Sequence, residues 1–293
     1  MSEAAVAASR SAAADYVELT KPRITLTVVL TAFVGYALGS TGNILTGRLA
    51  AALVGTALVA AGASCLNMLL ERRTDSRMLR TRNRPLPAGR LRPPEALAWG
   101  LALTTTGLLL LAWRTGTLSA AVAFVTWASY LFFYTPLKTR TSLSTVVGAL
   151  PGALPPVIGW AAARGRLEPG AFVLFAIVFL WQIPHFLAIA WLYREDYARG
   201  GLPMLPVLDP DGRITGRQAV ANTLALLLVS LAPTAAGLAG RTYLAGALVL
   251  GLGFTAVAVR AAVVRTPRAA RSLFVASILY LVSLCALLLA DRV

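Results

Sequence analysis

Long uninterrupted runs of apolar residues alternate with short polar segments along the whole chain. Nine of these runs are close to the roughly 18 to 20 residues that a helix needs to cross a hydrocarbon core about 30 Å thick. A transmembrane β-barrel would instead alternate apolar and polar positions. We therefore predict an all-α polytopic membrane protein with nine transmembrane helices. The expected spans are 24–41, 49–70, 96–113, 118–135, 143–163, 170–192, 218–239, 242–260 and 272–290.

The composition supports this interpretation. Of 293 residues, 57% are hydrophobic and only 13% are charged, whereas a soluble domain carries about a quarter charged residues. The first span is not expected to be a cleaved signal peptide, because it follows a polar leader and Lys21-Pro22-Arg23 stands directly before it. We expect residues 1–20 to be a disordered leader and residues 21–293 to form one nine-helix domain.

The net charge of +15 is distributed unevenly between the two sides of the predicted bundle. The N-terminus and the loops after spans 2, 4, 6 and 8 hold 21 of the 27 Lys and Arg residues. This bias predicts a cytoplasmic N-terminus, and it favours a membrane surface over nucleic acid as the partner of the basic residues. Cys65 and Cys285 both fall inside spans, which indicates small apolar fillers and no disulfide or metal spacing.

Two long loops on the basic side, 71–95 and 193–217, have similar content. Each opens with acids at a helix end, continues with basic residues and reaches a turn bounded by prolines. Because the loops are four helices apart, the similarity suggests two related halves.

The first candidate site lies at the end of span 2. Asn67, Glu71 and Asp75 are spaced by four, so they share one face if the helix continues to about residue 77. Mg²⁺ prefers such oxygen ligands and usually bridges to substrate phosphate. An ordinary helix end, with the acids paired to nearby arginines, is the alternative. Asn67 argues against it, because an amide inside the membrane needs a partner.

Basic residues adjoin this site. Arg80 and Arg84 follow it directly, and Lys138 and Arg140 end span 4 on the same side. Guanidinium forks match phosphate oxygens. Basic residues at a membrane boundary also bind anionic lipid head groups or serve as positive-inside anchors, and the sequence leaves these interpretations open.

The second candidate site runs from span 6 into the following loop. His185, the only histidine, precedes Asp196 by 11 residues, which is about 16 Å along a helix and nearly the same face. Trp181 and Gln182 lie one turn further inside. Polar side chains within a span favour a polar cavity, so we interpret the segment as an acceptor pocket with phosphate chemistry at its mouth. A histidine bonded to a neighbouring helix is the alternative.

Several segments, taken in order, resemble one known family. Asn67–Arg90 reads NMLLERRTDSRMLRTRNRPLPAGR, and it is similar to the first acidic motif of the UbiA superfamily of intramembrane prenyltransferases. Its RTRNRPLPAGR part resembles, more narrowly, the protohaem IX farnesyltransferase (haem O synthase) branch. The other similar segments are TKPRIT (20–25), YTPLKTR (134–140), GALPGALPPVIGW (148–160), WQIPHFLAIAW (181–191) and REDYARGGLPMLPV (194–207).

This resemblance implies a prenyltransferase domain in the inner cell membrane with its active site on the cytoplasmic side. It further implies Mg²⁺-dependent transfer from farnesyl diphosphate to haem B, giving haem O, and it suggests association with other haem-biosynthesis membrane proteins. Carried over by position, the catalytic and metal-binding residues would be Asn67, Glu71, Asp75 and Asp196. The diphosphate-binding residues would be Arg80, Arg84, Lys138, Arg140 and Arg194. The acceptor pocket would contain His185, with Trp181 and Gln182.

The chain departs from the wider superfamily pattern at two points. Glu71 stands where Asp is usual, and the second motif offers only Glu195-Asp196 without a further acid four residues away. A second fully ligated Mg²⁺ is therefore not expected. Two other functions remain open, a prenyltransferase for an aromatic acid or quinone precursor and a transporter. A transporter would carry ionisable residues at the midplane, whereas the carboxylates here gather at one interface.

Overall fold

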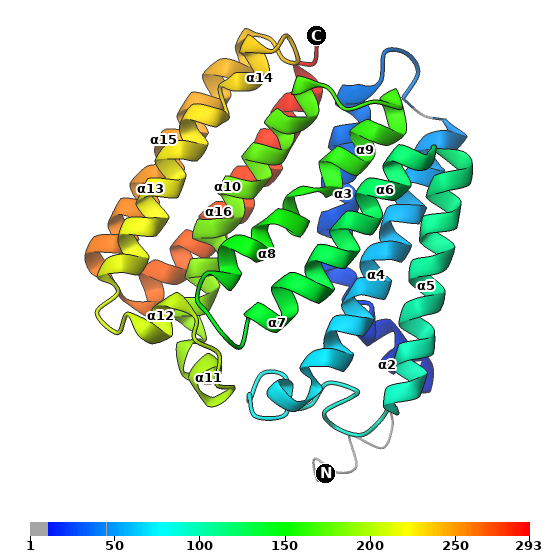
Figure 1. Cartoon of the computed structure of the whole chain (residues 1–293). Coiled ribbons are helices and arrows are strands. Elements are labelled where there is room, and N and C mark those ends of the chain that lie inside the picture. The colour runs from blue at the N-terminus through cyan, green and yellow to red at the C-terminus, as the bar shows by residue number, and fades with distance from the viewer. Residues whose placement is uncertain (1–10, 45) are drawn as a thin grey trace.

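The computed structural model describes residues 11–44 and 46–293, and in that part of the chain nine helices are long and apolar enough to cross a membrane (Figure 1). Six of them are continuous: α3 (Pro22–Gly39), α4 (Gly47–Asp75), α5 (Pro93–Arg114), α10 (Pro169–Leu192), α15 (Arg241–Val264) and α16 (Pro267–Ala290). The predicted all-α class and the nine spans are confirmed. The boundaries differ most at three places: α4 continues past the predicted end at residue 70, and the span that starts at Arg213 and α16 both begin before their predicted starts at residues 218 and 272.

The other three spans are interrupted near their ends or in the middle. The fourth consists of α6 (Thr117–Ala128), the π-helical segment η1 (Ser129–Tyr134) and α7 (Thr135–Leu137). The fifth consists of α8 (Ser144–Ala153) and α9 (Pro155–Arg164), and the seventh of α13 (Arg213–Val229) and α14 (Ala232–Ala235). Prolines follow each irregularity, because a proline removes a backbone donor and clashes with the preceding turn.

Glycines allow neighbouring helices to approach closely near the middle of the bundle. A Cβ added to Gly62 of α4 would lie 2.6 Å from the carbonyl oxygen of Gly100 in α5. A Cβ added to Gly35 of α3 would collide with the backbone of Pro156 in α9. Small residues commonly mediate such contacts between transmembrane helices. The close contacts hold α4 firmly, and α4 carries the first candidate site.

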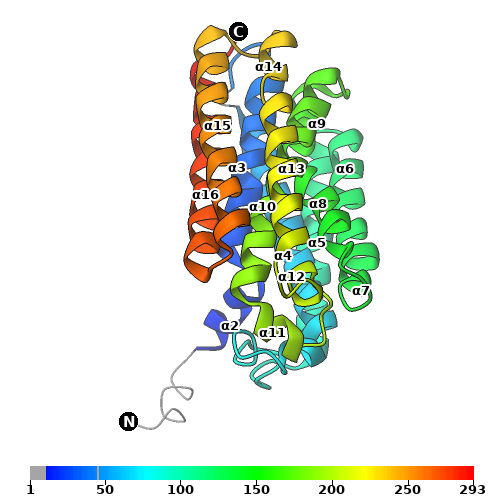
Figure 2. The same cartoon turned by 90° about the vertical axis from the view of Figure 1, so that its left-hand side faces the viewer.

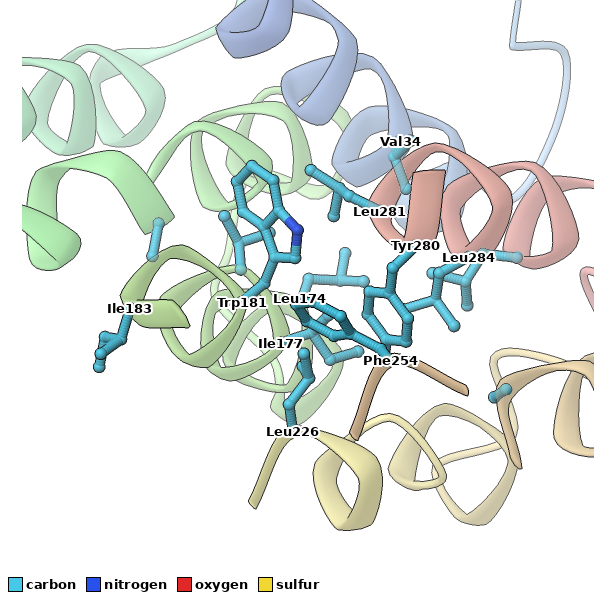
Figure 3. Packing of buried hydrophobic residues seen from close by; sticks show 14 of the residues in the cluster. Val34, Leu174, Ile177, Trp181, Ile183, Leu226, Phe254, Tyr280, Leu281 and Leu284 are labelled. Carbon is cyan, nitrogen blue, oxygen red and sulfur yellow. The ribbon is translucent and has the colours of Figure 1, made fainter. Parts of the chain in front are cut away.

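Helix α10 lies at the centre of the largest apolar cluster (Figure 3). Its Ile177 and Trp181 pack with Leu226 of α13, Phe254 of α15 and Leu284 of α16. These side chains are nearly inaccessible to solvent. The position of α10 is therefore fixed from several sides, which in turn fixes the segment that follows it.

The two ends of the bundle differ. One end contains α2 (Ala12–Leu19), the loop 76–92, α11 (Arg194–Arg199) and α12 (Leu205–Leu208), and we refer to it as the site end. The other end contains α14 and the C-terminus (Figures 1 and 2). The loops that carry most of the basic residues lie at the site end.

Residues 12–19 form helix α2, although the sequence led us to expect a disordered leader. Leu19 is fully buried in a cluster with Met68 and Leu86, and Asp15 forms an ion pair of 2.9 Å with Arg90. Burial of an apolar anchor together with this ion pair accounts for the order. Residues 1–10 lie outside the described residues.

Candidate active site at the end of helix α4

The last turns of α4 present Asn67, Glu71 and Asp75 on one buried face, which we refer to as the α4 face. Their exposed fractions are 1%, 8% and 1%. The expected continuation of the helix beyond residue 70 and the burial of this face are confirmed. Buried carboxylates are costly unless cations or hydrogen bonds accompany them. The surroundings of these three side chains therefore indicate what they do.

Glu71 is paired with Lys138, which follows α7 at the end of the fourth span. The Lys138 Nζ lies 3.0 Å from Glu71 Oε1 and 3.1 Å from Oε2. Burial alone would lower the pKa of Lys138, but the adjacent Glu71 carboxylate outweighs it and leaves the pKa above its ordinary value. The Glu71 carboxylate therefore favours the charged form of Lys138 at the α4 face.

Among the residues that the structure describes, only one of the two carboxylate oxygens of Asp75 has a hydrogen-bond partner. Its Oδ2 accepts a hydrogen bond from Arg84 Nη1 at 2.7 Å, and its backbone carbonyl accepts one from Thr81 Oγ1 at 2.8 Å. Its Oδ1 is buried and has no hydrogen-bond partner among the described residues. An unpaired buried carboxylate oxygen is costly, which indicates an atom kept available for a ligand.

Lys21 is a site residue that the sequence indicated only weakly, as part of Lys21-Pro22-Arg23 before the first span. Its backbone adopts a left-handed conformation, with φ of 48°, directly before α3. Its Nζ donates to Asn67 Oδ1 at 2.8 Å, and Asn67 Nδ2 donates to Thr135 Oγ1 at 3.1 Å. Burial of the ammonium group lowers the pKa of Lys21 to about 8. The only sequence signal was a lysine placed directly before a proline-initiated span.

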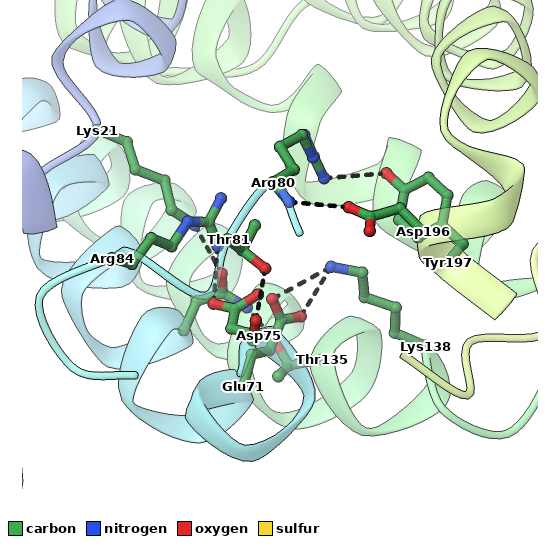
Figure 4. A network of polar contacts seen from close by, with 11 residues as sticks. Lys21, Glu71, Asp75, Arg80, Thr81, Arg84, Thr135, Lys138, Asp196 and Tyr197 are labelled. Carbon is green, nitrogen blue, oxygen red and sulfur yellow. Dashed lines mark hydrogen bonds and ion pairs between the residues drawn. The ribbon is translucent and has the colours of Figure 1, made fainter. Parts of the chain in front are cut away.

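Asp196 lies apart from the α4 face (Figure 4). Its Oδ1 accepts from the backbone N–H of Leu79 at 2.7 Å and from Arg199 Nη2 at 2.8 Å, while its Oδ2 accepts from the N–H of Arg80 at 3.1 Å. Burial acts to raise the pKa of Asp196, but these hydrogen bonds outweigh it and the pKa falls below its usual value. The carboxylate therefore anchors the loop that follows α4.

Asp196, which the sequence grouped with the α4 face as a metal ligand, does not contact that face in the structure. Both of its carboxylate oxygens accept N–H donors, and the metal set stays a prediction. Across residues 11–44 and 46–293, no three acidic, histidine or cysteine side chains converge as a set of metal ligands. The oxygen donors that remain close together are those of the α4 face.

The predicted diphosphate-binding cations fall into two groups. Arg84 and Lys138 contact the α4 face, as described above. The Arg80 guanidinium lies 4.9 Å from the centre of the Tyr193 ring, and the exposed Arg194 guanidinium lies 4.9 Å from the centre of the Trp191 ring. Arg140 is exposed at the end of the fourth span. The structure therefore separates Arg80 and Arg194 from the α4 face.

The residues expected in the acceptor pocket lie along α10. Trp181 Nε1 donates to the Ser277 carbonyl at 2.6 Å, and Gln182 Nε2 donates to the Ala149 carbonyl at 3.2 Å. These two buried side chains join α10 to α16 and α8, a packing role that differs from the expected one. His185 is half-buried, stacks on Trp181 with ring centres 5.0 Å apart, and its Nδ1 lies 2.7 Å from Ser277 Oγ. The alternative of a histidine bonded to a neighbouring helix is thus observed.

Comparison with known proteins places the chain in a family. The model of the UbiA prenyltransferase family matches residues 28–284. A protoheme IX farnesyltransferase of Solibacter usitatus is 51% identical over 95% of this chain and 98% of its own, and one of Salinibacter ruber is 44% identical over 94% and 98%.

Solved structures agree in fold. A digeranylgeranylglyceryl phosphate synthase superposes with a TM-score of 0.78 at 16% identity, covering 94% of this chain and 97% of the other. A UbiA homologue of Archaeoglobus fulgidus bound to GPP and Mg²⁺ superposes with a TM-score of 0.66 at 18% identity, covering 94% and 99%. The chain therefore belongs to the UbiA prenyltransferase family.

Proposed function

We propose that the protein transfers the farnesyl group of farnesyl diphosphate to a vinyl group of haem B, giving haem O. The observation that carries the transfer chemistry is the α4 face, a buried amide and two carboxylates surrounded by cations from three other segments. The choice of acceptor and donor rests on the relatives named protoheme IX farnesyltransferase, which match nearly the whole chain.

The charges at the α4 face favour a polyanionic ligand that arrives with a divalent cation. Two carboxylates face three cations, namely Lys21, Arg84 and Lys138. The unpaired Oδ1 of Asp75 lies beside the oxygens of Glu71 and Asn67, which accept hydrogen bonds from Lys138 and Lys21 in this structure. Together these oxygens are a donor set of the kind that suits Mg²⁺. When bound there, Mg²⁺ would neutralise negative charge on the diphosphate. The UbiA homologue bound to GPP and Mg²⁺ supports this assignment by analogy of fold.

The residues of the chain would act on the leaving group. Arg84 and Lys138 are positioned to meet the charge that develops on the diphosphate as the carbon–oxygen bond at C1 breaks. The vinyl group of haem B then forms a carbon–carbon bond to C1 of the farnesyl cation. Water adds to the resulting cation next to the porphyrin and loses a proton, which leaves the hydroxyethylfarnesyl group. No strong general base is needed for the carbon–carbon step.

The allylic cation must be kept from bulk water, and aromatic residues beside the α4 face are suited to this. Tyr130 and Tyr134 of η1 stack with ring centres 5.3 Å apart, and the Lys138 Nζ lies 5.7 Å from the centre of the Tyr134 ring. Aromatic faces attract cations, and a dry site strengthens each electrostatic contact. These rings would therefore shield the farnesyl cation after the diphosphate departs.

The test uses purified protein with farnesyl diphosphate, haem B and Mg²⁺, and it detects haem O by mass analysis of the extracted haems. Haem O should form with the native chain and stop when a chelator removes the metal. Parallel reactions supply an aromatic acid or a quinone precursor in place of haem B. Prenylation of one of those acceptors without any haem O would overturn the proposal.

We further propose that the protein resides in the inner cell membrane with the site end facing the cytoplasm, since 21 of 27 basic residues belong to that side. Arg82 at the site end and Arg166 at the other end are both exposed. A single cysteine introduced at each position, with Cys65 and Cys285 replaced by Ala, would report orientation. A membrane-impermeant maleimide should label position 166 in cells whose outer membrane has been permeabilised, and position 82 only in inverted vesicles. The reverse pattern would contradict the topology.

A further inference from the structure

A second polar feature of the site end is a cavity of about 470 Å³ that does not include the α4 face. It lies where α10 passes into α11, beside the start of α16 and the loop after α4. We refer to it as the arginine cavity, and its principal lining residues are Arg80, Trp191, Tyr193, Arg194, Arg199 and Pro267.

Two of the three arginines in this cavity lack an acidic partner in the part of the chain that the structure describes. Arg80 and Arg194 form no ion pair with a carboxylate in residues 11–44 and 46–293, whereas Arg199 pairs with Asp196 at 2.8 Å. Arg80 makes one long hydrogen bond of 3.5 Å to the hydroxyl of Tyr197. The cavity thus holds two guanidinium groups that form no ion pair among the described residues, although an exposed acid, Glu195, also lines it.

Aromatic rings fix the direction of both guanidinium groups. Arg80 lies over Tyr193 and Arg194 lies over Trp191, each 4.9 Å from the ring centre. A guanidinium held against a ring keeps its N–H edge available, and such an edge binds a carboxylate through two parallel hydrogen bonds. Two guanidinium groups held in fixed directions in one cavity suit a ligand with two carboxylates.

We propose that the arginine cavity binds the two propionate carboxylates of the haem acceptor, an inference that rests on the proposed function. Haem B carries both propionates on one edge of its ring. The cavity lies at the site end, where α10 ends and α11 begins. From there α10 runs through the bundle toward the other end (Figure 1). Capture of the acidic edge at the site end would direct the opposite, apolar edge into the bundle.

The two acidic sites of the site end differ in what they offer a metal-bound diphosphate. Asp196, beside this cavity, accepts hydrogen bonds at both carboxylate oxygens, from the N–H groups of Leu79 and Arg80 and from Arg199. The α4 face instead keeps the free Oδ1 of Asp75. The two anionic ends of the two substrates would then be held by separate sets of cations, so the protein could bind both substrates together.

The experiment combines a change in the protein with a change in the ligand. The double variant Arg80→Gln/Arg194→Gln is compared with Arg213→Gln/Arg217→Gln, which removes two exposed arginines from the same end. Each protein is given haem B or the dimethyl ester of haem B, which keeps the ring and the vinyl groups but lacks free carboxylates. KM is measured for both acceptors and for farnesyl diphosphate.

For the native protein and the control variant, we expect a KM for the ester about tenfold above that for haem B. In Arg80→Gln/Arg194→Gln, the KM for haem B should rise about tenfold to the value for the ester. The KM values for the ester and for farnesyl diphosphate should change less than about twofold. Retained turnover of the ester shows that the variant is folded.

Four results would overturn the proposal for the arginine cavity. Equal increases in KM for haem B and its ester would mean that the arginines do not recognise carboxylates, and an increase confined to farnesyl diphosphate would assign them to the donor. An effect that appears only in nanodiscs containing phosphatidylglycerol, and not in pure phosphatidylcholine, would make the cavity a lipid head-group site. If the native protein makes no haem O at all, the proposed function itself fails. Haem O formation with unchanged kinetics in the double variant refutes only the arginine cavity.

Discussion

The end of α4 and the start of α11 each present a buried aspartate next to arginines, yet the two aspartates are bound in different ways. Asp75 accepts one side-chain hydrogen bond, from Arg84, and keeps a buried oxygen free. Asp196 accepts two backbone N–H groups and one guanidinium. The difference shows that hydrogen-bond satisfaction, and not composition, separates an acid kept for a ligand from one that supports the backbone.

Asp196 also affects the surroundings of Asp75. The N–H groups that Asp196 binds belong to Leu79 and Arg80, which lie in the loop between α4 and Arg84. By anchoring this loop, Asp196 limits the positions that the Arg84 side chain can take beside Asp75. The two regions therefore differ in role: the α4 face is the proposed ligand site, and Asp196 holds the loop that carries Arg84.

The largest expected effect comes from removing the charge of Asp75. Asp75→Asn keeps the shape but withdraws the free anionic oxygen, so turnover should fall by about a thousandfold, measured as haem O formed at saturating substrates. The matched control is Asp209→Asn, which changes a buried aspartate that accepts two hydrogen bonds from Thr215 away from the site. It should lose thermal stability but keep turnover. Retention of a tenth of native turnover by Asp75→Asn would remove the proposed distinction between the two aspartates.

The Glu71–Lys138 pair permits a test that separates stability from activity. Lys138→Gln should lower the melting temperature, because Glu71 is left charged and buried without its partner. Adding Glu71→Gln should restore much of the melting temperature, while turnover stays about a hundredfold below native. The measurements are thermal unfolding in detergent and turnover for both single variants and the double variant. Recovery of turnover in the double variant would mean that the pair serves only to hold the fold.

Part of this comparison could be predicted from the sequence because it depends on local spacing. Asn67, Glu71 and Asp75 share a face through helical periodicity alone, and the structure confirms that face. The nine spans follow from the length of apolar runs in the same way. The contrast between Asp75 and Asp196 depends instead on which N–H groups from distant parts of the chain lie beside each carboxylate in the folded protein. The local spacing of residues does not predict these contacts.

Other contacts could not be predicted, for the same reason. Trp181 and Gln182 carry polar groups inside a span. Such residues can line a cavity or bond to a neighbouring helix, and the local sequence is the same in both cases. The structure gives them carbonyl partners on α16 and α8. Lys21 could not be assigned to the site, because its approach to Asn67 depends on a left-handed backbone and on the packing of α3 against α4.

Asp196→Asn should have an intermediate effect. The amide keeps one acceptor oxygen, so one of the two N–H groups of the loop and the Arg199 pair lose their partner. We expect the KM for farnesyl diphosphate to rise about tenfold, because Arg84 is less well positioned, with a smaller change in kcat. Asp211→Asn, at an exposed aspartate of the same end, is the control and should change neither constant. A thousandfold loss of kcat in Asp196→Asn would return this residue to the catalytic set.

The smallest expected effect concerns the contact between α2 and the loop. Arg90 pairs with Asp15 at 2.9 Å and donates to the carbonyl of Asn83, the residue before Arg84, at 2.8 Å. Arg90→Gln should therefore raise the KM for farnesyl diphosphate about threefold at constant kcat, since a partly exposed ion pair contributes at most about 1 kcal/mol. The control is Arg92→Gln, because Arg92 is exposed and pairs with Glu95 of its own segment. Equal changes in the two variants would mean that α2 is only attached to the bundle. A change confined to Arg90→Gln would mean that the leader, through the loop, helps to position the cation that Asp75 binds.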